Sequence, residues 1–235
     1  MKLLTFNIQH GGGTRVSTIL DNVLKHNADT VVLTEFRQNK NAITIKENLY
    51  KNGYIYSSSS SLDPKKNSVF IASKFHFITS LFPLELKEDA HRALFAQFKD
   101  INILGVYFAQ KELKRNLFNF INNNFINLSN NNGLVIGDFN TGNFYEDEKN
   151  ATFSCTHEFN ELKVNGLVDS WRSRNKGIKE FSWYSHAGNG FRIDHIFSTT
   201  TIDNRIKNIY YSHNEREQKI SDHSAMIVEI ANKTE

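Results

Sequence analysis

Short apolar runs alternate with amphipathic stretches along the chain, beginning with an apolar run at residues 3–8. This run predicts a buried strand, and it is followed by three consecutive glycines at 11–13. Thr14 is expected to be the N-cap of a helix, because apolar residues recur at helical spacing over 16–24. A second strand is expected at 30–34. The chain therefore begins with a strand, helix, strand unit.

The rest of the pattern predicts more strands than helices. Further helices are expected at 40–51, 111–127 and 157–165. Further strands are expected at 54–59, 68–73, 75–81, 93–98, 101–108 and 134–136, around 168, and at 181–184, 193–198, 206–211 and 225–230. Several of these strands are separated by only a turn, whereas a purely parallel sheet needs a crossover helix each time. The pattern therefore favours an α/β fold in which two mixed sheets pack face to face with helices outside.

Composition narrows the class of protein. Hydrophobic residues make up 39% of the 235 positions and charged residues 23%, a balance typical of a globular chain and unlike that of a disordered or fibrous one. No shift in composition marks a boundary, so we expect one compact domain over residues 1–235. The formal net charge of +3 weakly favours anionic partners such as phosphate esters or nucleic acid.

The single cysteine and the apolar runs bear on localisation. Cys155 has no second cysteine to pair with, which excludes a disulfide-stapled secreted scaffold, and we expect it to be an inert, partly buried thiol. The first residues lack the apolar segment and cleavage site of a signal peptide, and no run of about eighteen apolar residues could span a bilayer. We therefore expect a cytoplasmic protein with no membrane partner.

Acidic, amide and imidazole residues stand repeatedly at the ends of the apolar strands. They occur within residues 6–10, 33–35, 136–140, 192–196 and 221–224. A single carboxylate after a strand most often forms a turn or caps a helix. The sequence Gly137-Asp138-Phe139-Asn140 is different, because glycine permits close backbone approach while the carboxylate and the amide could converge on one phosphate. Asp222-His223, between a polar loop and an apolar strand, also indicates more than a turn.

The order and context of these five motifs resemble the endonuclease/exonuclease/phosphatase superfamily. The resemblance runs from Leu3 to Ile230 and is closest to the branch that contains exonuclease III and the abasic-site endonucleases. It implies the deoxyribonuclease I-like fold, a four-layer α/β sandwich, which agrees with the strand pattern. It also implies a divalent-metal-dependent phosphodiester hydrolase, with nucleic acid, and DNA in particular, as the expected substrate.

By position, the resemblance assigns a metal site to Glu35, Asn7 and Asp222. Glu35 corresponds to the primary ligand of a hard ion, expected to be Mg²⁺ or Mn²⁺. Asn7 corresponds to the amide of this site, and Asp222 would add a further contact.

The resemblance also assigns the groups that act on the phosphate. Asp138 corresponds to the residue that orients and deprotonates the attacking water, and Asn140 to the amide that hydrogen-bonds a non-bridging oxygen. His223 corresponds to the phosphate-facing histidine, which Asp194 would orient and keep cationic. Tyr107 aligns with the phosphate-binding tyrosine of the abasic-endonuclease branch. The implied reaction is in-line displacement by water.

Two further residues are candidates for substrate binding. Arg92 stands where some relatives place a phosphate-binding arginine, although a solvated strand end is an equal alternative. Trp183 lies in a Ser-Trp strand like that of the abasic-endonuclease branch, although aromatic residues in strands are usually core. His195 is expected to pack locally. Weaker candidates are His10, Arg216 and the charged start of a helix at Lys111, Lys114 and Arg115, for which a solvated face is the common alternative.

The sequence departs from the abasic-endonuclease branch at several places. Gln9 stands where some members have an acidic metal-site residue, Ala109-Gln110 replaces a Pro-Asn pair, and Asn67-Ser68 lacks a common glycine. The segment between Trp183 and Arg192 is also short. Abasic-site specificity therefore does not follow from the resemblance.

Two other interpretations of the function stay open. A phosphatase or phosphodiesterase acting on a lipid head group, an inositol phosphate or another small ester would use the same chemistry, although no apolar membrane-facing loop is evident. A non-catalytic binding module is disfavoured, because such a chain would be expected to have lost at least one of the assigned residues. The sequence leaves open DNA against RNA, endonuclease against exonuclease and the number of metal ions, and a monomer is the default.

Overall fold

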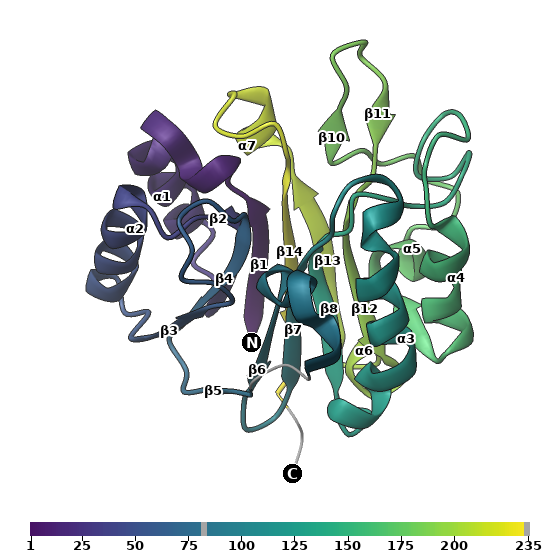
Figure 1. Cartoon of the computed structure of the whole chain (residues 1–235), viewed down its shortest axis with the longest axis horizontal. Helices are drawn as coiled ribbons and strands as arrows, with labels where there is room; N and C mark the ends of the chain where they lie inside the picture. Colours follow the sequence, from purple (N-terminus) through teal and green to yellow (C-terminus); the bar gives the residue numbers. More distant parts are fainter. Residues whose placement is uncertain (81–83, 233–235) are drawn as a thin grey trace.

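The computed structural model describes residues 1–80 and 84–232, which form two six-stranded β-sheets with helices on their outer faces (Figure 1). The first sheet has the strand order β13 (Ile206–Ser212), β14 (Ala225–Ile230), β1 (Lys2–Asn7), β2 (Thr30–Phe36), β4 (Ser68–Ser73) and β3 (Tyr56–Ser59). The second has the order β5 (Ile78–Thr79), β6 (Ala93–Gln97), β7 (Asn102–Tyr107), β8 (Gly133–Asp138), β12 (Asp194–Thr199) and β9 (Leu167–Asp169). Strands β1 and β2 are parallel, as are β7 and β8, and the other neighbours are antiparallel. Both sheets are therefore mixed, as the short connections predicted.

The two sheets pack face to face through aliphatic side chains. Val32 of the first sheet lies in one buried cluster with Ile103 and Ile136 of the second. A Cβ atom on Gly105 of β7 would lie 2.8 Å from Cγ1 of Val69 in β4, so glycine at this position lets the two sheets approach closely. The inner faces of the two sheets therefore share one apolar core.

Amphipathic helices cover the outer face of each sheet. Helices α1 (Val16–Lys25) and α2 (Lys40–Lys51) lie on the first sheet, and α3 (Arg115–Leu128) and α4 (Thr156–Val164) lie on the second. Helix α1 buries Ile19, Leu20 and Val23 in one cluster with Phe6 and Leu33 of the sheet. Burial of such an apolar stripe supplies most of the stability of a helix this short. The layer order of helix, sheet, sheet, helix is the four-layer α/β sandwich expected from the sequence.

The entry to α1 differs from the prediction. Thr14 is not the N-cap, because a 3₁₀ segment, η1 (His10–Arg15), precedes the helix, whose N-cap is Arg15 without a side-chain hydrogen bond. The three glycines at 11–13 all have positive φ. They turn the backbone tightly, and the regular helix begins only after this turn.

Other elements are shorter or more divided than predicted. The helix expected at 111–127 is a 3₁₀ turn, η3 (Lys111–Lys114), followed by α3. The strand expected at 75–81 is confined to β5, and Leu81 lies outside the described residues. The strand expected at 181–184 is β10 (Trp183–Tyr184), which pairs with β11 (Gly190–Phe191) in a projecting hairpin (Figure 1).

Several short helices were not predicted. They are η2 (Leu84–Arg92), α5 (Ser170–Arg174), α6 (Thr200–Asp203) and α7 (Asn214–Glu217). The three α-helices among them are too short to show a periodic apolar pattern. Within residues 1–80 and 84–232, no helix has both the length and the apolar character that crossing a membrane requires.

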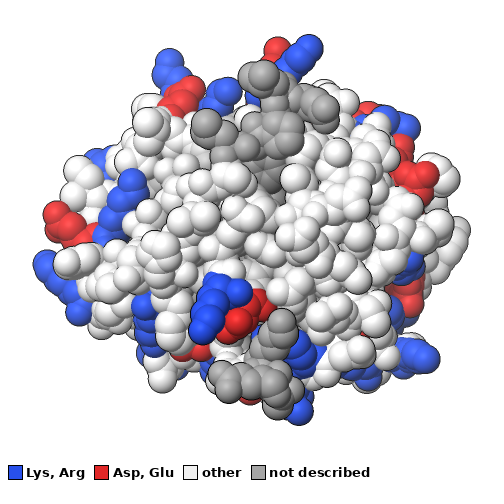
Figure 2. Space-filling model, turned by 90° about the horizontal axis from the view of Figure 1, so that it is seen from below, with Lys and Arg blue, Asp and Glu red and all other residues white. Residues whose placement is uncertain are grey.

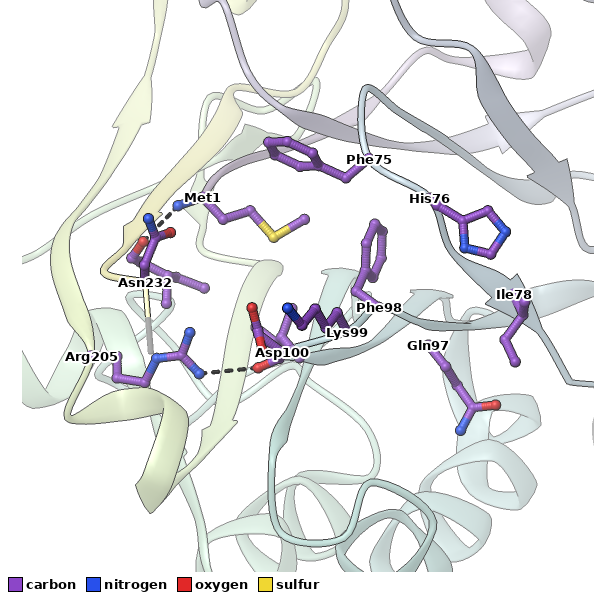
Figure 3. A pocket seen from close by; sticks show the side chains of 12 residues that line it. Met1, Phe75, His76, Ile78, Gln97, Phe98, Lys99, Asp100, Arg205 and Asn232 are labelled. Carbon is purple, nitrogen blue, oxygen red and sulfur yellow. Dashed lines mark hydrogen bonds between the residues drawn. The ribbon is translucent and has the colours of Figure 1, made fainter. Parts of the chain in front are cut away.

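The two ends of the sandwich differ in character. At the end that carries Met1, a hollow of about 760 Å³ opens between the sheets, and Phe75 and Phe98 are among the residues that line it (Figure 3). Seen from this end, most charged side chains lie around the rim of the molecule (Figure 2). Arg205 of the hollow already donates to the Asp100 carbonyl oxygen at 3.1 Å (Figure 3). The polar strand ends meet at the opposite end of the sandwich.

Candidate active site

Side chains from both sheets come together at the end of the sandwich opposite this hollow. Asn7 ends β1, and Glu35 lies near the end of β2, its parallel neighbour. Asp138 ends β8, and Asp194 begins β12, which runs antiparallel to β8 so that the two aspartates are paired in register. His223 precedes β14, which is antiparallel to β1. The topology therefore gathers residues that are far apart in the sequence at one edge of the sandwich.

Unusual backbone conformations support this arrangement. Glu35 has a φ of 55° at a bulge, where the pairing of β2 with β4 shifts, and Asn140 has a φ of 50°. Gly137 has a φ of 145°, and a Cβ atom there would lie 2.0 Å from the carbonyl oxygen of Val106, so no other residue fits. Left-handed conformations at residues other than glycine cost on the order of 1–3 kcal/mol and cluster at functional sites.

The side chain of Asn7 is the centre of the site. Its Nδ2 donates to Oε1 of Glu35 at 3.2 Å and to Oδ2 of Asp138 at 3.0 Å, and it lies 3.4 Å from Nε2 of His223. The Ser221 hydroxyl donates to the Asn7 carbonyl oxygen at 2.7 Å, which ties β1 to the loop before His223. Two carboxylates and an imidazole thus converge on one buried amide.

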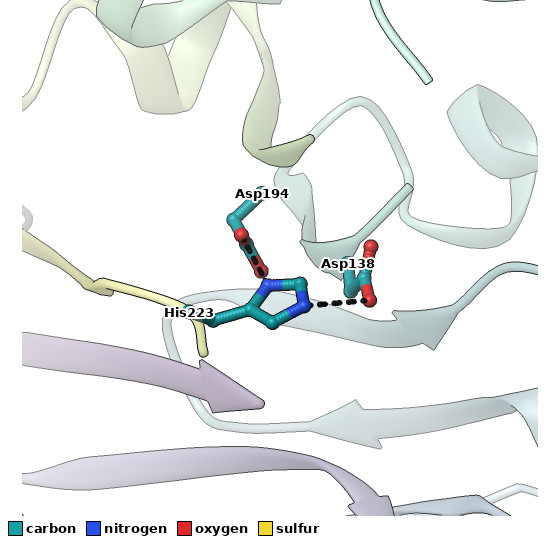
Figure 4. A group of neighbouring side chains, drawn as sticks. All are labelled: Asp138, Asp194 and His223. Atoms are coloured by element: carbon teal, nitrogen blue, oxygen red, sulfur yellow. Dashed lines mark hydrogen bonds and ion pairs between the residues drawn. The ribbon is translucent and has the colours of Figure 1, made fainter. Parts of the chain in front are cut away.

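His223 is held between two aspartates, one from each of two neighbouring strands (Figure 4). Its Nδ1 lies 2.8 Å from Oδ2 of Asp194, and its Nε2 lies 4.0 Å from Oδ2 of Asp138. Burial by itself lowers the pKa of His223, but the Asp194 carboxylate raises that pKa to about 10. Two hydrogen bonds hold the Asp194 backbone in place. Its nitrogen donates to the Ser182 hydroxyl at 3.2 Å, and its carbonyl oxygen accepts from the Tyr211 hydroxyl at 2.5 Å. The imidazole is therefore oriented and cationic at neutral pH.

Asp138 is almost completely buried, with 1% of its surface exposed. Burial raises its pKa to about 7, although the His223 imidazolium opposes this shift. Its Oδ1 accepts from the backbone nitrogen of Asn140 at 2.9 Å. A carboxylate of this kind can gain or lose a proton near neutral pH, as general acid–base chemistry requires.

Lys114 is a residue whose place the sequence did not reveal. It is buried, and its Nζ donates to the Asn140 carbonyl oxygen. Burial lowers the pKa of Lys114 to about 8, against the opposing effect of Asp138. Arg115 pairs instead with Glu112 and Glu158. The interpretation of Lys114 as part of a solvated helix start is therefore wrong.

A second group of polar side chains surrounds Glu35. Its Oε2 accepts from the backbone nitrogen of His10 at 2.8 Å and from Nδ2 of Asn67 at 3.1 Å. Asn67 also donates to the Tyr107 hydroxyl at 3.4 Å, and burial raises the pKa of that hydroxyl. The Arg92 guanidinium lies 5.6 Å from the centre of the Tyr107 ring. Tyr107 and Arg92 are thus connected to Glu35, and Asn67, noted in the sequence only as a departure, provides the link.

Trp183 and Asp222 form the wall on the hairpin side. The indole Nε1 of Trp183 donates to Oδ2 of Asp222 at 3.0 Å, and Trp183 also forms a β-bridge with His223. Both side chains are partly exposed, so Trp183 is not simply core. Its contacts place Asp222 at the rim of the site.

The donor set suits a divalent cation. Three carboxylates, those of Glu35, Asp138 and Asp194, outnumber the two buried cations beside them, His223 and Lys114. The exposed His10 imidazole also lies 2.8 Å from Oε2 of Glu35. The ligand atoms of Asp138, Asp194 and His223 lie within 4.8 Å of one another, and this buried cluster could hold a metal ion. Oxygen donors with surplus negative charge match the preference of hard ions. The residues present therefore fit a bound divalent metal.

A second cluster of charges lies next to the site, and each of its carboxylates is paired with a guanidinium. The Arg192 network comprises Arg192, Arg172, Asp147 and Asp169. Arg192 donates to Asp147 at 2.7 Å. It also donates to both carboxylate oxygens of Asp169, at 3.2 and 2.6 Å. Arg172 donates to Asp147 at 2.8 Å. His195 is buried beside this network, with Nε2 2.8 Å from the Thr141 carbonyl oxygen, and it packs locally as predicted.

Comparisons with known proteins agree with this architecture. Residues 4–223 match the family model described as Endonuclease/Exonuclease/phosphatase family. No curated protein matches the sequence.

Solved structures share the fold at low sequence identity. An AP endonuclease from Archaeoglobus fulgidus superposes with a TM-score of 0.82 at 19% identity, over 98% of this chain and 99% of that chain. The 3′-5′ exonuclease NExo from Neisseria meningitidis superposes with a TM-score of 0.83 at 21% identity, over 99% of this chain and 100% of that one. A 3′ phosphatase NExo variant from Neisseria bound to a product DNA hairpin gives 0.82 at 21% identity, over 99% and 100% of the two chains. All three share the two-sheet sandwich.

Proposed function

Because this chain belongs to the endonuclease/exonuclease/phosphatase family, as its motifs implied, we propose that it is a divalent-metal-dependent nuclease that cleaves DNA. The reaction is in-line attack of water on a phosphodiester, carried out by one catalytic domain over residues 1–235 that acts as a monomer in the cytoplasm. A single observation carries the proposal. Asp138, whose pKa burial raises to about 7, lies buried beside the ion pair of His223 and Asp194.

Asp138 is assigned the role of general base. Burial raises the pKa of its carboxylate to about 7, near the working pH, where proton transfer is most effective. Asn7 and the backbone of Asn140 fix its two oxygens, so the attacking water would be held in one orientation.

Charge that develops on the phosphate is stabilised by fixed donors. The His223 imidazolium, oriented by Asp194, supplies a positive charge that needs no reorganisation during the reaction. Asn140 and Tyr107 are assigned to the non-bridging oxygens, with Arg92 above Tyr107 as a further phosphate contact.

We assign the metal ion to Glu35 and Asn7, with Asp222 as an additional contact. The cluster of Asp138, Asp194 and His223 is the less suitable position, because a cationic imidazole has no lone pair to offer a metal ion. Mg²⁺ or Mn²⁺, when bound, would act as a Lewis acid on the phosphate and offset the surplus negative charge of the site. Glu35 is suited to this role, because its side chain is 13% exposed at the mouth of the site, whereas Asn7 and Asp138 are buried.

DNA is proposed as the substrate on two grounds. The solved structures with the same fold are described as an AP endonuclease, a 3′-5′ exonuclease and a 3′ phosphatase bound to a DNA hairpin. The chain has a formal net charge of +3, which favours a polyanionic partner. The phosphatase among these structures keeps a second candidate open, a metal-dependent phosphatase acting on a small or terminal phosphate ester.

The test compares substrates under matched conditions. The purified protein is incubated with end-labelled single-stranded DNA, duplex DNA, abasic-site duplex and RNA, with Mg²⁺, Mn²⁺ or EDTA. Glu35→Ala and Asp138→Ala serve as site variants, and thermal unfolding verifies that both are folded. Release of inorganic phosphate from a 3′-phosphorylated strand and from p-nitrophenyl phosphate is measured in parallel.

EDTA-sensitive cleavage that both variants lose would support the nuclease and name its substrate. Phosphate release without strand cleavage would replace the nuclease with the phosphatase. Full metal-dependent activity in both variants would overturn the assignment of the site.

A further inference from the structure

We propose that Tyr184, Arg216 and Lys219 form a binding subsite for the nucleotide that adjoins the cleaved phosphodiester. The inference rests on the proposed nuclease function and adds to it the kind of strand that the enzyme takes. The subsite is a hollow of about 300 Å³ lined by Gln9, Tyr184, Arg216, Lys219, Ser221 and Asp222.

This hollow adjoins the active site. Asp222 belongs to both, because it lines the hollow, accepts from Trp183 and directly precedes His223. The β10–β11 hairpin, which carries Tyr184, and α7, which carries Arg216, project from the same end of the sandwich (Figure 1). A strand whose phosphate lies at His223 would therefore meet this hollow with a neighbouring nucleotide.

Tyr184 offers an exposed aromatic surface. Its side chain is 41% exposed, although the Arg216 guanidinium lies 4.5 Å from the ring centre and the Phe181 ring meets it edge-on at 5.9 Å. A core tyrosine would be covered on all sides. An accessible aromatic ring beside a guanidinium is the arrangement on which nucleic-acid bases stack.

Arg216 and Lys219 supply positive charge at the same place. Nε of Arg216 donates to the Ser224 hydroxyl at 3.1 Å, which anchors the side chain to the residue after His223. Its two terminal nitrogens have no hydrogen-bond partner among the described residues, and Lys219 is exposed. Two cations against the one carboxylate of Asp222 leave the hollow positive beside a negative catalytic centre. A phosphate group fits this position.

The exposed ring of Tyr184 and the positive charge of Arg216 and Lys219 together indicate the class of substrate. A small phosphate ester would fill the catalytic centre without reaching Tyr184, so it would gain nothing from the subsite. A base inside a duplex has both faces covered by its neighbours and cannot stack on a side chain. The subsite therefore fits an unpaired or terminal nucleotide of a DNA strand.

The experiment is a double-mutant cycle in which one change is made in the protein and the other in the substrate. Cleavage kinetics of an end-labelled single-stranded oligonucleotide with Mg²⁺ are measured for the wild type, Tyr184→Ala, Tyr184→Phe and the exposed control Tyr50→Ala. The measurements are repeated with a tetrahydrofuran spacer, which lacks a base, placed in turn at each position flanking the mapped cleavage site. Thermal unfolding verifies that every variant is folded.

Tyr184→Ala should raise KM by about tenfold, while Tyr184→Phe, which keeps the ring, and Tyr50→Ala should not. One spacer position should cause the same loss in the wild type and no further loss in Tyr184→Ala, because both changes remove the same contact. Arg216→Gln and Lys219→Gln should each reduce the slope of log kcat/KM against log salt by about one, and Lys51→Gln should leave it unchanged.

The outcomes separate the two proposals. Wild-type protein that cleaves no strand with either metal overturns the proposed function and the subsite with it. Wild-type cleavage combined with an unchanged KM in Tyr184→Ala, or with losses from variant and spacer that simply add, overturns the subsite alone.

Discussion

The Arg192 network and the active site are two clusters of buried charge in one molecule, and their charge balance differs. In the Arg192 network, two guanidinium groups face the carboxylates of Asp147 and Asp169 at hydrogen-bond distance. In the active site, the carboxylates of Glu35, Asp138 and Asp194 outnumber the buried cations His223 and Lys114. Arg192 and Asp194, two residues apart in the chain, belong to different clusters.

This difference in charge balance distinguishes a cluster that stabilises the fold from a cluster that binds a ligand and carries out chemistry. A buried charge with its partners in place is neutralised and has no further capacity to bind. A cluster with surplus charge is unfavourable by itself and is completed by a ligand, so it gives up stability to gain binding and catalysis. The predictions below test this contrast, beginning with the largest expected effect.

Substituting Asp138 should destroy activity and spare the fold. Asp138→Asn keeps the shape of the side chain but removes the proposed base, so turnover should fall by roughly three or more orders of magnitude. The melting temperature should stay the same or rise, because a carboxylate that burial destabilises is lost. Metal-dependent cleavage and thermal unfolding measure the two effects. A large fall in melting temperature would mean that Asp138 is structural.

Substituting Arg192 should mainly lower the stability of the fold. Arg192→Met leaves Asp147 and Asp169 buried without their main partner, and we expect a loss of about 3–5 kcal/mol in the free energy of unfolding. Urea denaturation measures this loss. The matched control is Arg174→Met, which breaks the more exposed pair with Asp203 and should cost about 1 kcal/mol or less. Equal effects of the two variants would contradict the contrast between the clusters.

The Arg192 network should also make the fold sensitive to acid. Burial alone would raise the pKa of Asp147, but the Arg192 guanidinium holds it well below its usual range, and the pKa of Asp169 is lowered in the same way. The unfolded chain therefore takes up protons first as the pH falls, so the stability from these pairs is complete above about pH 4 and is lost below it.

The expected slope below pH 4 is up to about 1.4 kcal/mol per pH unit for each carboxylate. Urea midpoints at pH 5, 4 and 3 measure it. Asp147→Asn should be less stable at pH 5 and show the shallower decline, and parallel curves for the wild type and this variant would refute the prediction.

The smallest effect is expected at Lys114, a buried lysine beside the active site that interacts with Asp138. Lys114→Met keeps the apolar stem but removes the donor to the Asn140 carbonyl, so Asn140 should lose its fixed position in the site. We expect kcat to fall by about tenfold, in the range of a lost positioning contact. The exposed neighbour Lys111→Met is the control. An unchanged kcat with a lower melting temperature would show that Lys114 serves only the fold.

The sequence predicted the layers of the fold because its apolar pattern is strong where the sheets are buried. The helix at 40–51 and the strand at 68–73 have the predicted bounds. The short helix α7 was missed, since one turn gives no periodic signal. The N-cap at Thr14 was wrong, because glycine backbone geometry, which side-chain preference does not report, determined where the helix begins.

The convergence of the candidate residues was predictable where a polar residue stands at either end of an apolar strand. Asp138, Asp194 and Asn7 all have this position, and the strand pairing brings them together. Lys114 and Asn67 were not recognised. A buried lysine at the start of a helix looks the same in sequence as a solvated one, and the contact of Asn67 with Glu35 depends on the bulge in β2. Their roles become visible only with the tertiary structure.

The division of the site between the two sheets has a consequence for the chain during its synthesis. Asn7 and Glu35 are synthesised well before His223, which belongs to the loop before β14, and this strand inserts between β13 and β1. No growing chain that stops short of this strand holds the imidazole beside Asp138. A nascent chain therefore has no complete catalytic centre until the segment that carries His223 and β14 has been synthesised.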